Sequence, residues 1–286
     1  MNIQQRYQLS SDLWHAITGI PWTGSEQEPD CVAKLVYTLP GAIKNSLNAA
    51  LPGRQIAAGG AFIHQKPIVH FVNKPGLRDP ELGDLLIVCR ERRASGAVYN
   101  AMLLQAKMTD NVWRTNIPRD HQFVLYSEWP VFEYKRAGIL TGKRRNIFPK
   151  TITQGAQYLL IYKNAPCNMW IATVDIPLRG SSCFASTLAS IISFDEGRTF
   201  QATNPRDDWS QMILDLLQLA ATSVFNRKNS GSLKAKRWAG PAAFDYILNL
   251  EQSGSENGGL GLTTNSEGSD AICGVSVICV DLGIAK

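Results

Sequence analysis

The chain of 286 residues contains no hydrophobic run that approaches eighteen residues, and this absence argues against a membrane-spanning helix. The first 22 residues also lack the basic stretch followed by an apolar stretch that marks a secretory signal. Charged residues make up 19% of the chain and hydrophobic residues 44%, which is typical of a folded protein and excludes a disordered one. We therefore expect a soluble, cytoplasmic protein without membrane contact.

Metal-binding cysteine and histidine patterns are also missing. The six cysteines are scattered without a Cys-x-x-Cys pair, and the four histidines do not fall at metal-ligand spacing, so a zinc site is not expected. The same scatter favours a reduced, intracellular protein without disulfides. A net charge of +5 permits contact with a polyanion such as nucleic acid but does not require it.

A polar set stands out where two strands are predicted. Asp84 opens an apolar run, and after a polar turn the chain returns through a second apolar stretch that ends in Gln105 and Lys107. Residues two apart on a strand point to the same face, so Gln105 and Lys107 emerge together. If residues 93–96 form a hairpin loop, antiparallel pairing places Asp84 opposite Gln105. A carboxylate, an amide oxygen and an ammonium group would then meet, as a site for a divalent metal and a phosphate requires.

These residues resemble those of the PD-(D/E)XK nuclease superfamily. Asp84 followed after twenty residues by Gln105-Ala106-Lys107 is similar to the Gln-x-Lys variant of Mrr-type restriction enzymes, and Gln122 with Tyr126 resembles the Gln-xxx-Tyr element of RecB-type and λ-exonuclease-type members. The resemblance covers roughly residues 26–165. It implies an α/β fold with a restriction-endonuclease-like mixed sheet core (αβββαβ) flanked by helices, followed by a C-terminal helical and strand extension.

The resemblance also implies a catalytic set and a cofactor. Asp84 would be the main ligand of Mg²⁺ or Mn²⁺, with the Gln105 side-chain oxygen and the Ala106 carbonyl completing the protein ligands. Lys107 would orient the attacking water and stabilise charge that develops on the phosphate. Gln105 replaces the usual Glu and removes a negative charge, so we expect weaker metal affinity and better support of activity by manganese than by magnesium.

Each of the remaining candidate residues has both a functional and a structural interpretation. Glu28 is either an acidic metal ligand from the first helix or the partner of Ser25 in a capping box. Gln122 and Tyr126 share a helix face and could contact a phosphate, or Tyr126 is core and Gln122 is exposed. The basic run Lys143, Arg144 and Arg145 would suit contact with a nucleic-acid backbone, or it is a solvated loop.

The remaining pattern predicts the organisation of the chain. Helices are expected over residues 11–17, from Ser25 to about Ile43 with a kink or division at Pro40, and over residues 120–129, 209–225 and 244–250. Strands are expected over residues 56–63, paired with 67–72 and bulged at Gly59-Gly60, and over residues 157–162 and 170–176. The predicted units are an N-terminal lead-in (1–24), the nuclease-like core (25–180), a helical extension (181–252), a flexible linker (253–270) and a C-terminal strand (271–286). That strand should dock on the edge of its own sheet or on a neighbouring subunit.

The function that these expectations favour is a metal-dependent deoxyribonuclease that hydrolyses phosphodiester bonds. Family analogy points to the effector subunit of a bacterial restriction or anti-phage defence system, acting on DNA with a partner protein or as a homo-oligomer. Two alternatives stay open: a catalytically inactive nuclease-like subunit that binds nucleic acid or scaffolds a complex, and an interaction protein with an unrelated α/β fold.

Overall fold

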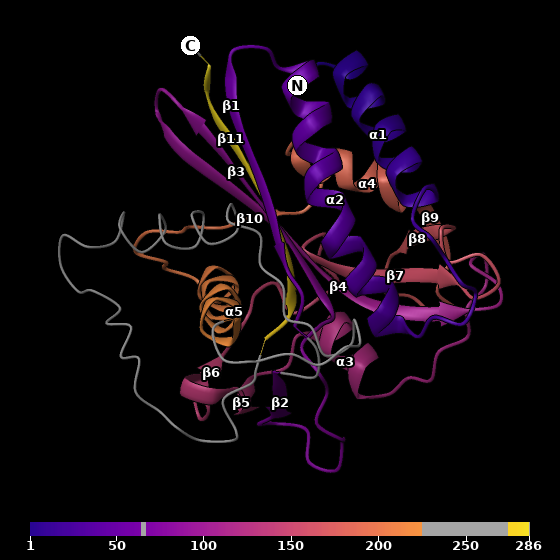
Figure 1. The fold of residues 1–286 in the computed structure, drawn as a ribbon. Helices are drawn as coiled ribbons and strands as arrows, with labels where there is room; N and C mark the ends of the chain where they lie inside the picture. Colours follow the sequence, from indigo (N-terminus) through magenta and orange to yellow (C-terminus); the bar gives the residue numbers. More distant parts are fainter. Residues whose placement is uncertain (64–66, 225–273, 286) are drawn as a thin grey trace.

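The computed structural model describes residues 1–63, 67–224 and 274–285 (Figure 1). Its helices are α1 (Ile3–Thr18), α2 (Glu28–Ala50), α3 (His121–Glu128), the 3-10 turn η1 (Gly138–Leu140), α4 (Phe184–Ile192) and α5 (Asp208–Val224). Its strands are β1 (Arg54–Ala61), β2 (Ile68–Phe71), β3 (Leu85–Arg93), β4 (Gly96–Thr109), β5 (Phe132–Arg136), β6 (Arg144–Arg145), β7 (Ala156–Tyr162), β8 (Met169–Ala172), β9 (Gly180–Cys183), β10 (Arg198–Thr199) and β11 (Ser276–Ala285). The helix expected over residues 244–250 and the linker expected over 253–270 lie outside the described residues.

A mixed sheet forms the centre of the molecule. Its strand order is β1-β11-β3-β4-β7-β8-β9, with β10 beside β4. Strands β3 and β11 run parallel, as do β4 and β7, and the other neighbours are antiparallel. Helices α1, α2 and α4 pack on one face, and α3, α5 and a small sheet of β2, β5 and β6 pack on the other (Figure 1). The predicted α/β class, a mixed sheet flanked by helices, is confirmed at this level.

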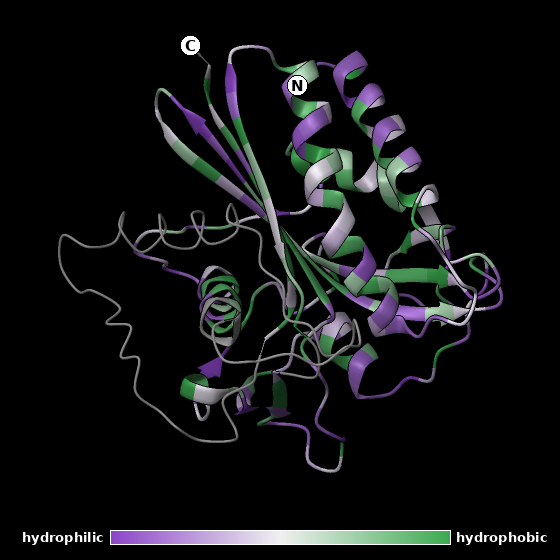
Figure 2. Ribbon diagram, in the orientation of Figure 1, coloured by the Kyte–Doolittle hydropathy of each residue, from purple (hydrophilic) through white to green (hydrophobic). Residues whose placement is uncertain are grey.

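Hydrophobic residues follow the sheet because both of its faces are covered. Along β3, Leu86 and Val88 enter one core while Leu85 and Ile87 enter the other. In Figure 2 the central strands are largely green, whereas the outer sides of α1 and α2 carry purple, hydrophilic positions. Each of these helices therefore buries its hydrophobic side against the sheet and exposes its polar side to solvent.

The hairpin of β3 and β4 has the register that the sequence predicts. A two-residue turn at Ala94 and Ser95 pairs Arg93 with Gly96, which adopts a φ of +117° that glycine tolerates best. The same register pairs Leu85 with Leu104. The ladder ends at this pair, and the Asp84 N–H donates to the Leu104 carbonyl at 2.9 Å, which brings Asp84 beside Gln105.

Two expectations for the segment after α2 were wrong. Strand β2 does not pair with β1; it pairs with β5 in the small sheet. The irregularity of β1 lies between Arg54 and Ile56, not at Gly59-Gly60. Gly60 instead lets the strand approach α2, because a Cβ at this position would lie 2.6 Å from the Val36 carbonyl oxygen.

The C-terminal strand β11 docks on its own sheet, one of the two expected outcomes, but it lies inside the sheet between β1 and β3, so the expected position at an edge was wrong. An interior strand uses the hydrogen-bonding groups of both its edges, and its side chains enter both cores: Val277 on one face, Ile278 and Val280 on the other. On β11, Asp281 also accepts two hydrogen bonds from the buried Arg90 guanidinium, at 2.9 and 2.6 Å. Burial on both faces explains why this segment is so apolar.

Elements outside the predicted core range pack on the same sheet. Helix α1 lies against α2 and α4, and α5 contacts β6 and β11. In the part of the chain that the structure describes, no helix combines the length and the hydrophobicity needed to cross a bilayer.

Candidate functional site

Asp84 and Gln105 are in direct contact, as the hairpin register requires. The Asp84 Oδ2 accepts hydrogen bonds from the side-chain Nε2 of Gln105 and, at 2.8 Å, from the backbone N–H of Ala106. The Gln105 side chain is almost fully buried, with 4% of the residue exposed. Its amide nitrogen faces Asp84, and the oxygen Oε1, on the other arm of the amide, is the atom that could ligate a cation. Ala106 contributes its N–H to this contact, and the role of its carbonyl as a metal ligand, which the resemblance implies, stays a prediction.

The Asp84 carboxyl is poised to titrate near neutral pH. Burial raises its pKa to about 7, and the nearby charge of Glu81 adds to the rise. The hydrogen bond from Ala106 opposes the rise, as does the charge of Lys107. A carboxylate so disfavoured by desolvation gains most from a nearby cation, which is how functional carboxylates often differ from structural ones.

Glu28 lies at the first residue of α2 and reaches the end of β4. Its carboxylate accepts a hydrogen bond from the Met108 N–H; burial raises its pKa, while the charge of Lys107 opposes that rise. The capping box predicted from Ser25 to Glu28 was wrong, because the helix begins two residues later. Gln27 is the N-cap, and its N–H donates to Asp30 at 2.9 Å, so Glu28 is free of the capping role.

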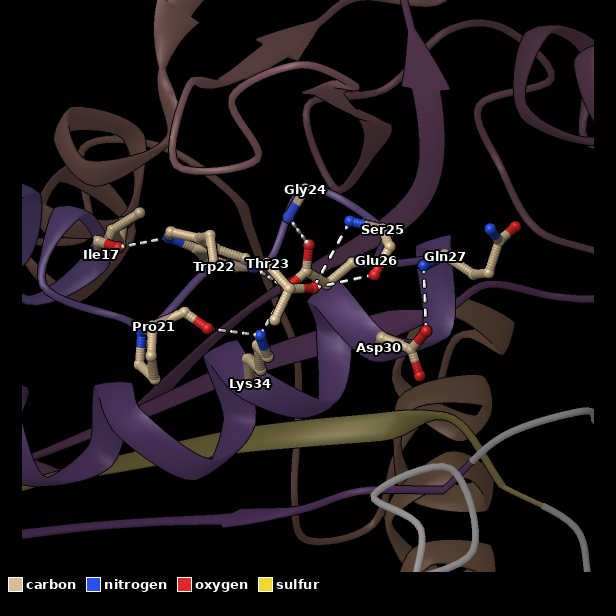
Figure 3. Close-up of polar contacts among 10 residues, drawn as sticks. All are labelled: Ile17, Pro21, Trp22, Thr23, Gly24, Ser25, Glu26, Gln27, Asp30 and Lys34. Carbon is tan, nitrogen blue, oxygen red and sulfur yellow. Dashed lines mark hydrogen bonds and ion pairs between the residues drawn. The ribbon is translucent and has the colours of Figure 1, made fainter.

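The start of α2 is held by a compact network around Glu26 (Figure 3). The buried Glu26 carboxylate accepts from the backbone N–H groups of Thr23 and Gly24 at 2.6 and 2.8 Å, and from Lys34 Nζ at 2.5 Å. Lys34 also donates to the Pro21 carbonyl at 2.7 Å. Burial alone would raise the pKa of Glu26, but these hydrogen bonds overcome it and lower the pKa to about 2. The network fixes the point from which Glu28 extends. Further along, Pro40 lies within α2 without dividing it.

Glu81 is a member of the site that the sequence analysis missed. Its charge raises the pKa values of both Asp84 and Glu28, so the three carboxyls lie near one another. The sequence indicates a role for Glu81 only in that its carboxylate lies three residues before Asp84. A bridge between Glu81 and Ile68 of β2 sets its position, and this long-range pairing is invisible in the local pattern.

The side chains around Asp84 supply only part of the ligands that a hard cation such as Mg²⁺ needs. Within the described residues, no three acidic, histidine or cysteine side chains are grouped closely enough to hold a metal ion. The ligands at hand are therefore one carboxylate, Asp84, the neutral oxygen of Gln105, and Glu28 or Glu81 after a movement. Oxygen ligands of this kind suit Mg²⁺ or Mn²⁺, which retain several waters.

Lys107 and Gln122 line one hollow, with about 570 Å³ of empty space. Asp120 and Asn116 contribute to the same wall. The Asp120 side chain also caps α3 by accepting from the Gln122 N–H at 3.0 Å, which fixes Gln122 in the first turn of the helix. Asp84 lines a different, narrower hollow. Lys107 and Gln122 thus share a hollow that Asp84 does not line, so the expected meeting of Asp84, Gln105 and Lys107 at one point stays a prediction.

Tyr126 occupies the core beneath Asp84. Its hydroxyl donates to the Leu82 carbonyl at 2.9 Å, its ring stacks on Trp129 with centroids 5.7 Å apart, and burial raises its pKa well above the usual value. A Cβ at Gly83 would lie 2.9 Å from this hydroxyl. Tyr126 therefore positions the segment that leads into Asp84 and presents no hydroxyl to a substrate.

Two residues of the basic run are engaged by carboxylates. Arg145 binds Asp215 of α5 at 2.6 Å in a nearly buried pair, and Arg144 donates to Glu133 at 2.8 Å. Lys143 is exposed. Arg145 thus anchors the small sheet to α5, which leaves Lys143 and Arg144 as the accessible basic residues of this run.

Comparisons with protein-family models, with curated proteins and with solved structures find no match to this chain.

Proposed function

We propose that the protein is a metal-dependent nuclease that hydrolyses phosphodiester bonds in DNA. The observation that carries the proposal is the contact of Asp84 with Gln105 and Ala106, one strand position away from Lys107, around a carboxyl whose pKa is raised to about 7. The order of elements gives limited further support. Among the strands of the central sheet and the helices that cover it, α2, β1, β3, β4, α3 and β7 follow one another in the order αβββαβ, although β2, β5 and β6 of the small sheet stand between them in the chain and β11 separates β1 from β3.

Each residue has a role in this proposal. Asp84 and the Oε1 of Gln105 would hold the cation, with Glu28 and Glu81 as the nearest further carboxylates. When bound, Mg²⁺ or Mn²⁺ would neutralise phosphate charge and favour ionisation of the attacking water. Lys107 stabilises negative charge on the phosphate, and Gln122, across the same hollow, orients the substrate or the water by hydrogen bonding.

The test is a cleavage assay on supercoiled DNA and on RNA, with magnesium and with manganese. Lys107→Ala should reduce DNA cleavage by at least roughly 100-fold, in the range found for loss of one charge-stabilising donor. Lys44→Ala is the matched control, because Lys44 is exposed on α2 in the cover of the opposite face. Equal cleavage by wild type and Lys107→Ala would contradict the assignment.

A second function is favoured by one observation. The Gln105 amide N–H already donates to an oxygen of Asp84, so this carboxyl group has a hydrogen-bonding partner within the protein without a cation. A catalytically inactive subunit that binds nucleic acid would then bind DNA with the same affinity in EDTA and in magnesium, and would cleave none. A role as the effector of a defence complex, with a partner protein or a second copy, rests on the resemblance. Co-purification of a stable assembly would support that role.

A further inference from the structure

The loop between β4 and α3, residues 110–120, carries a tryptophan on the molecular surface. Trp113 is 59% exposed, although a side chain of this size usually buries most of its area. Its ring packs against Trp170 of β8, with centroids 4.4 Å apart and planes tilted by 58°. The indole N–H of Trp170 donates to Asn168 Oδ1 at 2.6 Å, which fixes the supporting ring. One ring is held in place and the other is accessible.

The backbone that presents Trp113 is well ordered by hydrogen bonds. The Trp113 N–H donates to Asn111 Oδ1 at 3.0 Å. Thr115 and Leu178 exchange two backbone hydrogen bonds of 2.9 Å each, so the loop is tied to the segment before β9. Val112, next to Trp113, is buried in the core and 4% exposed. An aromatic ring on a fixed loop loses little freedom when a ligand stacks on it.

The same loop borders the candidate active site. Asn116 and Ile117 line the hollow that contains Lys107. In the sheet, Lys107 pairs with Leu160 of β7, and Leu160 pairs with Trp170 of β8. Two strand spacings correspond to roughly 10 Å, so the tryptophan pair lies within a few nucleotides of Lys107 along a bound strand.

The charge around Trp113 is complementary to phosphate. Arg114, Arg119 and Arg179 are exposed on the loop and on the segment tied to it. The acidic residues of the loop are engaged: Asp110 accepts from Lys163 at 2.9 Å, and Asp120 caps α3. Exposed arginines beside an accessible ring are the combination by which proteins hold single strands, with phosphates on the basic groups and bases on the ring.

We propose that Trp113, supported by Trp170 and flanked by Arg114 and Arg119, is a platform on which an unpaired nucleobase stacks. We call these four residues the tryptophan platform. The inference deepens the proposed function, on which it rests, by assigning the substrate class: a nucleic acid with a single-stranded segment next to the bond that is cleaved. A continuous duplex offers no free base face, because each base is stacked between its neighbours.

The test is direct binding without hydrolysis. Fluorescence anisotropy in EDTA would measure the affinity of a labelled single-stranded thymidine 20-mer and of a labelled duplex whose two ends are closed by non-nucleotide linkers, so that it contains no unpaired base. Trp113→Ala should weaken single-strand binding roughly 5- to 150-fold, the range for loss of one base–aromatic stack. Trp113→Phe should retain most of the affinity, because it keeps a ring. Trp14→Ala is the matched control, since Trp14 is 40% exposed on α1, which covers the other face of the sheet.

The outcomes separate the platform from the proposed activity. Single-strand affinity that is equal in wild type, Trp113→Ala and Trp14→Ala, or absent in wild type, overturns the platform. An equal loss of duplex affinity also overturns it, because a closed duplex cannot stack on the ring. Trp113→Ala could selectively lose single-strand binding while the wild-type protein cleaves nothing with magnesium or manganese. This result would support the platform and overturn the hydrolytic function. If the protein cleaves nucleic acid and Trp113→Ala changes neither cleavage nor single-strand affinity, the proposed nuclease function stands and the platform is overturned.

Discussion

Replacement of Asp84 by asparagine should stabilise the protein at alkaline pH, although it removes the residue that the proposed site depends on. The folded state raises the pKa of this carboxyl from 3.8 to about 7, because burial and Glu81 disfavour its charge. The folded protein therefore binds more protons than the unfolded chain between these two values, and the free energy of unfolding falls as pH rises through that window. Above pH 7 the charged Asp84 carboxylate destabilises the folded protein to the full extent, and below pH 4 this destabilisation is absent.

The magnitude follows from the size of the shift. One pKa unit corresponds to about 1.36 kcal/mol, so the rise at Asp84 amounts to roughly 4 kcal/mol at pH 8. The asparagine side chain keeps one oxygen, which can accept from both the Gln105 Nε2 and the Ala106 N–H, because both donate to the same oxygen of Asp84. We therefore expect Asp84→Asn to stabilise by about 2 to 4 kcal/mol at pH 8 and by less than about 0.5 kcal/mol at pH 4.

Urea unfolding at pH 4, 6 and 8 in EDTA, followed by tryptophan fluorescence, would measure the difference between variant and wild type. Asp110→Asn is the control, because Asp110 is an exposed partner of Lys163 and its replacement should change stability little at every pH. Addition of Mg²⁺ at ten times its Kd should raise wild-type stability by about 1.4 kcal/mol and leave Asp84→Asn unchanged. A variant that is less stable than wild type at pH 8 would refute the reasoning from desolvation.

Three further predictions concern the metal, the start of α2 and the last strand. Gln105→Glu restores a carboxylate and should lower the metal concentration for half-maximal cleavage; an unchanged dependence in both magnesium and manganese would place Gln105 outside the ligand set. Glu26→Gln should cost about 2 to 3 kcal/mol at pH 7, because the pKa of Glu26 is lowered from 4.5 to about 2. That stabilisation is complete above pH 4.5 and is lost as pH falls toward 2, so urea unfolding should show the two proteins converging at low pH. Truncation after Gln252 removes β11 and should give an insoluble protein, whereas a soluble truncation with a normal circular dichroism spectrum would contradict the interior placement.

The central hairpin could be predicted from the sequence because its information is local. The two-residue period and a short turn fix which side chains face one another, so Asp84 meets Gln105 without reference to the rest of the chain. The N-cap residue of α2, by contrast, was predicted at Ser25, two positions too early. The N-cap is Gln27, and the segment before it is held by the contact of the Glu26 carboxylate with Lys34, which the local pattern of a capping box does not contain.

Pairings between distant segments could not be predicted in this way. Strand β2 reads as a partner of β1 because it follows it, yet it pairs with β5, which lies far along the chain. Glu81 reaches the site through its bridge to the same strand β2, so no local pattern announces it. Nor does the exposure of Trp113 follow from its sequence, because a tryptophan is more often part of the core. Its accessibility depends on the bridge between Thr115 and Leu178.

The interior position of β11 also bears on the candidate site. Ser276 pairs with Leu85, the residue after Asp84, and it lines the hollow into which Asp84 opens. Its hydroxyl donates to the Ile63 carbonyl at 2.8 Å and accepts from the Ile63 N–H at 3.2 Å, which joins β11 to the end of the β1 segment. The wall beside Asp84 is therefore completed by residues near the far end of the chain. A substitution at Ser276 should for this reason disturb the pKa of Asp84 as well as the packing of the sheet, because desolvation of that carboxyl depends on the same wall.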